Sequence, residues 1–232
     1  MNSFFFYYLL FLQIFPANTF RNEYIAVDLW GRKTTTYRIL SINDNTTISI
    51  DGQIVATLNN GQFTDQSLDS NHYISATNPI SVAQFSESTR TDNFDSDPFM
   101  IMLSPIDQDI NNITFTVFDF PNSYISNYYL NIATESSCTP IITLDGVSIA
   151  SDFYTLESNP NFSVAQIKVE PGVHTLKSSN KDCGFNAYVY GFGAVESYGY
   201  SAGVRLDPIT LSEIDTVLCV DEEFDLQVES SP

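Results

Sequence analysis

Apolar and polar residues alternate with a period of two in short segments along most of the chain. In residues 47–50 two isoleucines alternate with a threonine and a serine, and the alternation resumes in residues 54–58. Successive side chains of a strand point to opposite faces, so this period is typical of half-buried β-strands. The pattern predicts no convincing helix, and it predicts strands at residues 24–29, 36–42, 47–50, 54–58, 80–85, 113–118, 128–133, 142–144, 147–149, 162–169, 173–176 and 186–192.

Two short motifs occur twice, in the same order in each half of the chain. A six-residue segment that ends in Asp-Gly lies at 47–52 and 141–146, and Ser-Val-Ala-Gln follows at 81–84 and 163–166. Asp and Gly tolerate the positive φ that both central residues of a type I′ turn require. Each half therefore predicts a tight hairpin followed by a further strand.

The many short strands, separated by closely spaced turn residues, predict an all-β fold. The expected form is an antiparallel β-sandwich built from two similar halves, at about residues 21–120 and 121–203. A β-propeller is the rival, but it needs four or more copies of a blade of about 40 to 50 residues. The Asp-Gly motif occurs only twice, more than one blade length apart, which favours the sandwich.

The charge of the chain narrows the range of partners. Its 232 residues include 28 acidic and 9 basic side chains, which give a formal net charge of -19. Such a surface repels phosphate backbones and anionic lipid heads, so nucleic acid is excluded as an expected partner. An acidic surface suits basic partners and divalent cations, and simple solubility is the alternative explanation.

The amino-terminal segment, residues 1–12, has two interpretations. Residues 4–12 form an unbroken apolar run that is too short to span a bilayer as a helix, so no transmembrane segment is expected. The run suits the apolar core of a secretory signal peptide. It contains many aromatic residues and no Lys or Arg precedes it, so an internal strand explains it equally well.

The chain shows few residues suited to catalysis. Its two imidazoles, His72 and His174, have no Cys, Glu or second His at metal-ligand spacing, and neither a Gly-x-Ser-x-Gly motif nor a phosphate-binding loop occurs. We expect no enzyme activity and no cofactor. Alternating oxygen donors at Asp92, Asp95 and Asp97 form a weak Ca²⁺ candidate, for which a solvated acidic loop is the simpler explanation.

Three sequons for N-glycosylation occur, at Asn45, Asn112 and Asn161. We expect all three at surface positions, near strand ends or loops. Their use depends on whether the source organism glycosylates secreted proteins.

Several further motifs occur in an order that resembles the IgGFc-binding domain family, over about residues 13–203. These motifs lie at 37–40 (Tyr-Arg-Ile-Leu), 44–47 (Asp-Asn-Thr-Thr), 55–63 (Val-Ala-Thr-Leu-Asn-Asn-Gly-Gln-Phe), 81–85 (Ser-Val-Ala-Gln-Phe), 97–100 (Asp-Pro-Phe-Met), 142–146 (Ile-Thr-Leu-Asp-Gly), 172–176 (Gly-Val-His-Thr-Leu), 187–193 (Ala-Tyr-Val-Tyr-Gly-Phe-Gly) and 197–200 (Ser-Tyr-Gly-Tyr). The resemblance implies a domain at residues 13–205 that acts as a non-catalytic recognition or adhesion module outside the cell, secreted or on the cell surface, as part of a larger protein.

The resemblance leaves the ligand open. A protein or a glycan on the extracellular side is expected, but a shared fold does not imply a shared site, so antibody binding does not follow from the family name. The alternative is a structural spacer with no ligand of its own. Residues 13–20 resemble the lead-in strand of the family, which favours a start inside a longer coding sequence. Residues 206–232 resemble a linker and the start of an immunoglobulin-like or PKD-type repeat.

The extracellular setting that the resemblance implies bears on the three cysteines. It favours a disulfide between Cys138 and Cys183, which would staple the second half of the domain. The alternative is two buried free thiols, which behave as small apolar residues. Cys219 is left over, and we expect its partner in the remainder of the following repeat.

Overall fold

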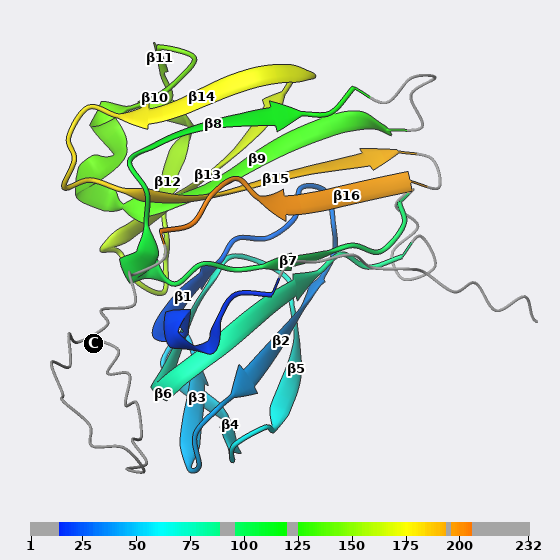
Figure 1. Ribbon diagram of the computed structural model, residues 1–232, viewed down its shortest axis with the longest axis vertical. Coiled ribbons are helices and arrows are strands. Elements are labelled where there is room, and N and C mark those ends of the chain that lie inside the picture. Colours follow the sequence, from blue (N-terminus) through cyan, green and yellow to red (C-terminus); the bar gives the residue numbers. More distant parts are fainter. Residues whose placement is uncertain (1–13, 89–95, 120–124, 194–195, 206–232) are drawn as a thin grey trace, which may run out of the picture.

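The computed structural model describes residues 14–88, 96–119, 125–193 and 196–205, and in these ranges the chain folds as three stacked antiparallel sheets. Figure 1 shows the stack, with one sheet below, a second in the middle and a third above. The expected all-β antiparallel fold is confirmed. Helical structure in the described ranges consists of short 3-10 turns, η1 (Ala17–Thr19), η2 (Ile106–Gln108), η3 (Ser136–Ile141) and η4 (Ala150–Asp152).

The lower sheet, called sheet I, is built around one long strand. This strand, β6 (His72–Phe85), pairs with β1 and β3 in its first part and with β2 and β7 in its last part. The hairpin strand β4 and the edge strand β5 complete the sheet. The other strands are β1 (Arg21–Ala26), β2 (Thr35–Ser41), β3 (Thr46–Ile50), β4 (Gln53–Leu58), β5 (Phe63–Leu68) and β7 (Met100–Met102).

The later part of the chain forms the other two sheets. Sheet II, in the middle, has the order β12 (Phe153–Thr155), β13 (Phe162–Val169), β9 (Ile125–Glu135), β15 (Phe185–Gly193), β16 (Glu196–Ser201). Sheet III, above it, has the order β11 (Val147–Ser148), β10 (Ile142–Leu144), β14 (Gly172–Ser178), β8 (Asn112–Val117). The two halves, at about residues 21–120 and 121–203, are therefore less alike than the repeated motifs predict. The strands up to β7 form one sheet, whereas β8, at the end of the first half, pairs with β14 of the second half, and the second half contributes to two sheets.

Strand β15 shows how sheet II serves two cores at once. All nine of its residues are buried, and their side chains alternate between the two neighbouring sheets. Tyr188, Tyr190 and Phe192 pack in the cluster shared with sheet I, whereas Ala187 and Val189 pack in the cluster shared with sheet III. A strand buried on both faces is apolar at nearly every position, which accounts for the run of aromatic and aliphatic residues here.

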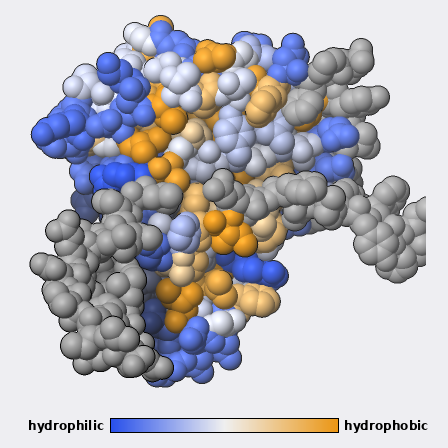
Figure 2. All heavy atoms as spheres, viewed as in Figure 1, coloured by the Kyte–Doolittle hydropathy of each residue, from blue (hydrophilic) through white to orange (hydrophobic). Residues whose placement is uncertain are grey.

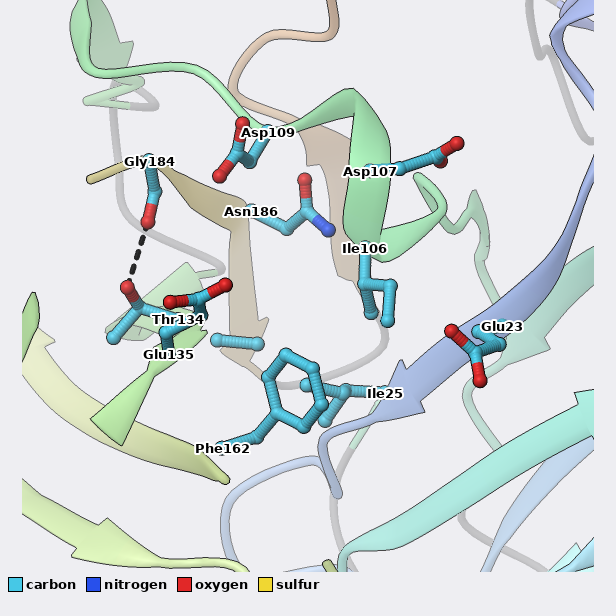
Figure 3. A pocket seen from close by; sticks show the side chains of 11 residues that line it. Glu23, Ile25, Ile106, Asp107, Asp109, Thr134, Glu135, Phe162, Gly184 and Asn186 are labelled. Carbon is cyan, nitrogen blue, oxygen red and sulfur yellow. Dashed lines mark hydrogen bonds between the residues drawn. The ribbon is translucent and has the colours of Figure 1, made fainter. Parts of the chain in front are cut away.

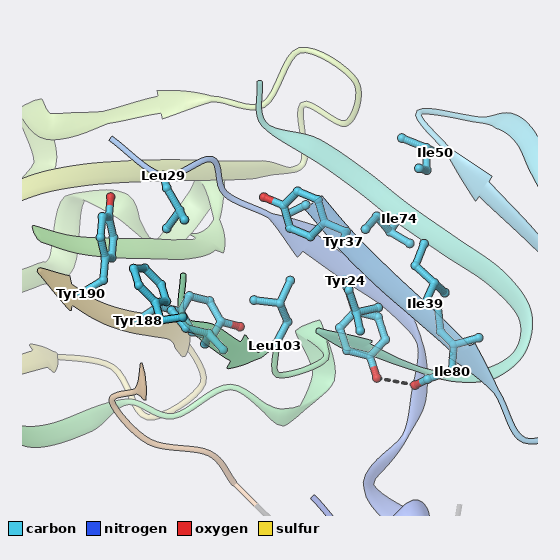
Figure 4. Packing of buried hydrophobic residues seen from close by; sticks show 14 of the residues in the cluster. Tyr24, Leu29, Tyr37, Ile39, Ile50, Ile74, Ile80, Leu103, Tyr188 and Tyr190 are labelled. Atoms are coloured by element: carbon cyan, nitrogen blue, oxygen red, sulfur yellow. Dashed lines mark hydrogen bonds between the residues drawn. The ribbon is translucent and has the colours of Figure 1, made fainter. Parts of the chain in front are cut away.

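The core between sheets I and II is rich in tyrosine. Tyr24, Tyr37 and Leu103 come from the sheet I side and meet Tyr188 and Tyr190 of β15, as Figure 4 shows. Each buried tyrosine needs a partner for its hydroxyl group, and the Tyr24 hydroxyl donates to the Ile80 carbonyl at 2.6 Å. Aromatic burial therefore comes with hydrogen bonds that fix how the two sheets meet.

Polar side chains from both sheets converge on the loop between β1 and β2. Gln84 of β6 donates to the Val27 carbonyl at 2.7 Å. Gln166 of β13 and Asn131 of β9 both donate to the next carbonyl, that of Asp28, at 2.6 and 2.7 Å. The two glutamines are the last residues of the two Ser-Val-Ala-Gln motifs. The second repeated motif thus has a common structural use, because both copies hold the same loop.

The same loop is also fixed by an aromatic stack. The Trp30 backbone N–H donates to the Tyr190 hydroxyl at 3.0 Å, and this hydroxyl donates to Asn131 Oδ1 at 2.9 Å. The Trp30 ring stacks on Tyr129 at a centroid distance of 5.6 Å. We call these contacts, together with those of the two glutamines, the joint. They tie sheet I to sheet II with buried hydrogen bonds, which cost free energy when one partner is removed.

The two Asp-Gly hairpins have the turn geometry that the sequence predicts. Asp51 and Gly52 have φ of 52° and 77°, and Asp145 and Gly146 have φ of 52° and 80°. Both central residues of each turn are thus in the left-handed region that a type I′ turn requires. The hairpins are β3–β4 in sheet I and β10–β11 in sheet III.

The outer surface is polar at both ends of the stack. In the view of Figure 2, hydrophilic residues cover the upper left and the bottom, and most of the hydrophobic residues lie between them. Among the most exposed large apolar side chains are Ile54, Phe63 and Val173, which lie on strands of two different sheets. Single exposed apolar residues of this kind are common on soluble domains.

Candidate functional site

A cavity of about 200 Å³ opens at the edge where sheets I and II meet. Its walls come from β1 of sheet I, from η2 and the residues after it, and from β9, β13 and β15 of sheet II. Figure 3 shows side chains from these elements pointing toward a common space. The lining residues are Glu23, Ile25, Ile106, Asp107, Asp109, Ala133, Thr134, Glu135, Phe162, Gly184 and Asn186.

One wall of the cavity is apolar. Ile25 of β1, Ile106 of η2 and Phe162 of β13 lie around the lower part of the space in Figure 3, and Ala133 of β9 adds a methyl group. Ile25 and Ala133 belong to a small buried cluster that Ile106 and Phe162 cover. This wall is therefore held in place by packing, and it offers an apolar surface to whatever enters.

The rest of the rim is acidic, and two of its four carboxylates have arginine partners. Arg21 Nε lies 3.0 Å from Asp107 Oδ2, and Arg205 Nη1 lies 3.9 Å from Asp109 Oδ1. The Asp107 side chain remains half exposed. Salt bridges at such exposure contribute about 1 kcal/mol or less, so they leave the rim open to exchange of partners.

The other two carboxylates are bonded by hydroxyl groups. Glu23 accepts a hydrogen bond from the Tyr73 hydroxyl, and Glu135 Oε2 accepts one from Ser137 Oγ at 3.5 Å. A hydroxyl group satisfies one lone pair of a carboxylate but does not neutralise its charge. Glu23 and Glu135 therefore have hydroxyl partners and, within the described ranges, no cationic partner.

Asp109 is the most buried of the four acids. Burial raises the pKa of its carboxyl group, and the negative charge of Glu135 raises it further, against the opposing effect of Arg205. The carboxyl group lies against Gly184, just before β15, where a Cβ atom would overlap it. A glycine at this position thus gives Asp109 its place in the cavity wall.

Asn186 adds a buried acceptor to the same wall. Its Nδ2 donates to the carbonyls of Ser104 and Pro105, at 3.3 and 3.0 Å, which fixes the orientation of the amide. Its Oδ1 is turned away from these carbonyls and has no hydrogen-bond partner in the described part of the chain, although the residue is only 4% exposed. Figure 3 places this amide between Asp109 and Ile106.

The disulfide predicted from the sequence is present. Cys138 of η3 is bonded to Cys183, which precedes β15, and the two Cα atoms lie 5.4 Å apart. The bond closes a loop with a sequence separation of 45 residues, and Cys183 adjoins the cavity residue Gly184. Disulfides of this kind persist in oxidising compartments.

The three sequons lie where the sequence places them. Asn45, Asn112 and Asn161 are all exposed, at a turn, at the start of β8 and before β13. Asn161 lines a shallow depression next to the cavity and shares it with Glu23 and Glu135. Glycosylation of these residues stays a prediction.

The Ca²⁺ candidate is placed only in part. Asp92 and Asp95 lie outside the described residues, and Asp97 is partly buried, with burial as the main cause of its raised pKa. No three His, Cys, Asp or Glu side chains of the described ranges are grouped so that they could hold a metal ion. The Ca²⁺ hypothesis stays a prediction. The apolar run at residues 1–12 and Cys219 also lie outside the described residues.

The structure also pairs both histidines with the aspartates of the Asp-Gly turns, which the sequence reasoning missed. His72 Nδ1 lies 2.5 Å from Asp51 Oδ2, and His174 Nδ1 lies 2.6 Å from Asp145 Oδ2. In both turns the other carboxylate oxygen accepts the backbone N–H of the residue after the histidine. The sequence shows an Asp-Gly turn and a histidine in each half. The paired residues are 21 and 29 positions apart, however, so they form no short motif.

The repeated pair fastens each hairpin to the neighbouring strand, and it has a use in structure rather than in catalysis. His174 Nε2 also lies 2.8 Å from the Glu170 carbonyl, so both ring nitrogens face acceptors. Burial lowers the pKa of His174, but the bonds to Asp145 and Glu170 outweigh burial and raise it. The pair is therefore most stable with the imidazole protonated.

Comparison with known proteins gives one match. The family model described as IgGFc binding protein matches residues 9–191, which is most of the chain. No curated protein and no solved structure matches. No helix in the described ranges is long and apolar enough to cross a membrane. On the extent of the match, the chain belongs to the IgGFc binding protein family.

Proposed function

We propose that the chain is a non-catalytic recognition and adhesion module of a larger extracellular protein, and that it binds a protein ligand at the cavity between sheets I and II. The single observation that carries the proposal is the combination of an apolar wall and a rim of hydrogen-bond acceptors in one surface cavity. Binding sites commonly join apolar surface with a few fixed polar groups. Membership of a family of binding domains supports the same function.

The extracellular setting belongs to the proposal as well. It is supported by the family and by the disulfide between Cys138 and Cys183, because such bonds are rare in reducing compartments. We place the domain at residues 13–205 and propose that residues 206–232 are a linker and the start of a further repeat. Cys219 then pairs within that repeat.

A structural spacer is the second candidate, and the joint is the observation that favours it. Buried or partly buried hydrogen bonds from Gln84, Gln166, Asn131 and Tyr190 make a stiff connection between two sheets. A stiff domain holds its neighbours at a fixed distance whether or not it binds a ligand. The spacer predicts no ligand, but it predicts a changed reach of the parent protein when the domain is deleted.

An array of extracellular proteins and glycans separates the two candidates. The full chain is applied to spots of matrix proteins, mucins, immunoglobulin Fc and glycans, and bound chain is detected through a terminal tag. We expect saturable binding to at least one protein, with little binding to a heat-unfolded sample of the same chain. Equal binding to all spots, or none above background, would leave the spacer as the better account.

A further inference from the structure

The polar groups of the cavity are almost all acceptors. Glu23, Asp107, Asp109 and Glu135 present carboxylates, and Asn186 presents its amide oxygen. Thr134 lies in the same wall, but its hydroxyl group already donates to the Gly184 carbonyl at 2.6 Å, as the dashed line in Figure 3 marks. A ligand that fits this wall must therefore bring hydrogen-bond donors.

The buried amide oxygen is the observation that points to a ligand. Asn186 is 96% buried, its Nδ2 is committed to two backbone carbonyls, and its Oδ1 lacks a partner in the described chain. A buried acceptor without a partner costs about 1 to 3 kcal/mol. Gln108 Oε1, in the adjoining η2, is in the same condition. Of the two, only Asn186 lines the cavity, so its Oδ1 is the acceptor that gains free energy when a donor enters there.

The charge of the rim decides between a neutral and a cationic donor. Within the described ranges Glu23 and Glu135 have hydroxyl partners and no cation, and the negative charges of Glu135 and Asp107 add to the larger effect of burial in raising the pKa of Asp109. A cation relieves this repulsion, whereas a neutral donor does not. The net charge of -19 also raises the local concentration of cationic ligands near the surface.

The size and the apolar wall decide between a metal ion and an organic cation. No three acids of the described ranges are grouped to hold one metal ion. A cavity of about 200 Å³ is smaller than the roughly 300 to 1,000 Å³ of small-molecule sites, and it has the scale of a single side chain. Lys and Arg carry an apolar stem and a charged tip that only donates hydrogen bonds.

We propose that this cavity binds one lysine or arginine side chain of the protein ligand, with its aliphatic stem against Ile106 and Phe162 and its charged tip among the carboxylates and Asn186. The proposal rests on the proposed function, since it names the group of the ligand that the cavity takes. Glu23 and Glu135 supply charge at the open rim, and Asn186 supplies the buried acceptor.

The test uses a pair of peptides that differ in one charge. The probes are acetyl-Gly-Ser-Lys-Ser-Gly-amide and the same peptide with norleucine in place of lysine, titrated into the full ¹⁵N-labelled chain and followed by NMR. We expect the lysine peptide to shift the amide signals of Gly184 and Asn186 and to bind at least tenfold more tightly than the norleucine peptide. Equal affinities of the two peptides would overturn the proposal.

Variants locate the effect at the rim. We expect Glu23→Gln and Glu135→Gln each to weaken binding of the lysine peptide about three- to tenfold, because each removes one charged partner. Glu196→Gln is the matched control, since Glu196 is exposed on β16 at the opposite edge of sheet II and does not line the cavity. The control is expected to bind as the unchanged chain does. A loss in Glu196→Gln as large as in the rim variants would overturn the site.

Folding and function are separated by two further readings. Unchanged amide signals in sheet III show that a rim variant is folded. If a variant is not folded, the unchanged chain is titrated with the lysine peptide in 0.5 M NaCl instead. We expect the added salt to weaken binding, and binding that does not depend on salt would contradict the proposal. If the array finds a protein ligand whose binding survives Glu135→Gln together with Glu23→Gln, the cavity is not the binding site, and the recognition function stands with its ligand on another surface. If the lysine peptide binds as expected while the array finds no ligand, the recognition function fails, and what stands is that the cavity can take a basic side chain.

Discussion

Removing one hydroxyl group, in Tyr190→Phe, tests whether the joint holds sheets I and II together. The Tyr190 hydroxyl accepts from the Trp30 N–H at 3.0 Å and donates to Asn131 Oδ1 at 2.9 Å. Burial raises the pKa of this hydroxyl group, so it stays protonated and remains a donor at all ordinary pH values. Phenylalanine keeps the ring and its packing on Tyr129 and removes the hydroxyl group with its hydrogen bonds.

The expected loss follows from the burial of the two partners. Asn131 is 1% exposed, so its Oδ1 loses a partner where water does not reach it easily, at a cost of about 1 to 3 kcal/mol. The Trp30 N–H is only partly buried and recovers some of its loss through water, so we assign it about 1 kcal/mol. We expect a total decrease of about 2 to 4 kcal/mol in the free energy of unfolding, against about 5 to 15 kcal/mol for a typical domain.

The assay is equilibrium unfolding in urea. Trp30 is the only tryptophan, it is 48% exposed, and it stacks on Tyr129 across the joint, so its fluorescence reports the joint while far-UV circular dichroism reports all three sheets. We expect both signals to shift together to lower urea. The matched control is Tyr200→Phe, which removes a hydroxyl group that donates to the Thr116 carbonyl at an exposed position away from the joint and should cost less than about 0.5 kcal/mol. A loss in Tyr190→Phe no larger than in this control would refute the reasoning.

Three further predictions concern the rest of the fold. Replacing Cys138 and Cys183 by serine should lower the free energy of unfolding by about 4 kcal/mol, the chain-entropy value for a 45-residue loop, in the same urea assay, and a loss below about 1 kcal/mol would contradict it. Folding raises the pKa of His174 and lowers the pKa of Asp145. Their pair should therefore stabilise the protein fully between about pH 4 and 6.5. The stabilisation should be lost as the pH rises through the folded pKa of the histidine, and also as the pH falls through the folded pKa of the aspartate. The melting temperature of His174→Gln should therefore match the parent chain more closely at pH 9 than at pH 6, and a difference that does not change with pH would show that the pair does not titrate as described. Limited proteolysis between about residues 119 and 127 should not release two stable fragments, because sheets I and II share one core, and recovery of two folded pieces would indicate separate domains.

The elements of this fold that the sequence predicts are those with a local cause. The Asp-Gly turns depend on two adjacent residues that tolerate positive φ, and both were predicted correctly. Strand β5 was missed because its sequence, Phe-Thr-Asp-Gln-Ser-Leu, has no apolar alternation. It is a strand because its backbone pairs with β2 along the sheet edge, which no local pattern records.

The apolar run of β15 in the sequence is a signal for the three-layer arrangement, but this run has two explanations. β15 was predicted as a strand, and its unbroken burial matches the apolar run Ala-Tyr-Val-Tyr-Gly-Phe. Such a run suits a strand that is covered on both faces, and it suits an ordinary sandwich strand as well. The repeated hairpins suggested two like halves, but β8, at the end of the first half, pairs with β14 of the second half in a separate third sheet.

The cavity could not be predicted from the sequence, for a different reason. Glu23, Asp109 and Glu135 are separated by long stretches of chain and become neighbours only because β1, η2 and β9 meet at one edge. In a chain with 28 acidic residues, no spacing distinguishes these three from the others. The disulfide was within reach because only three cysteines needed partners and the family resemblance supplied the compartment.

The central claim is that the cavity between sheets I and II takes a basic side chain, and nuclear Overhauser contacts between the lysine peptide and the full chain test it most directly. The account predicts contacts from the δ- and ε-methylene protons of the lysine to the ring of Phe162 and the methyl groups of Ile106, which form the apolar wall. Contacts from the bound lysine to other surfaces alone, such as the region around Asp65 on the edge strand β5, would contradict it.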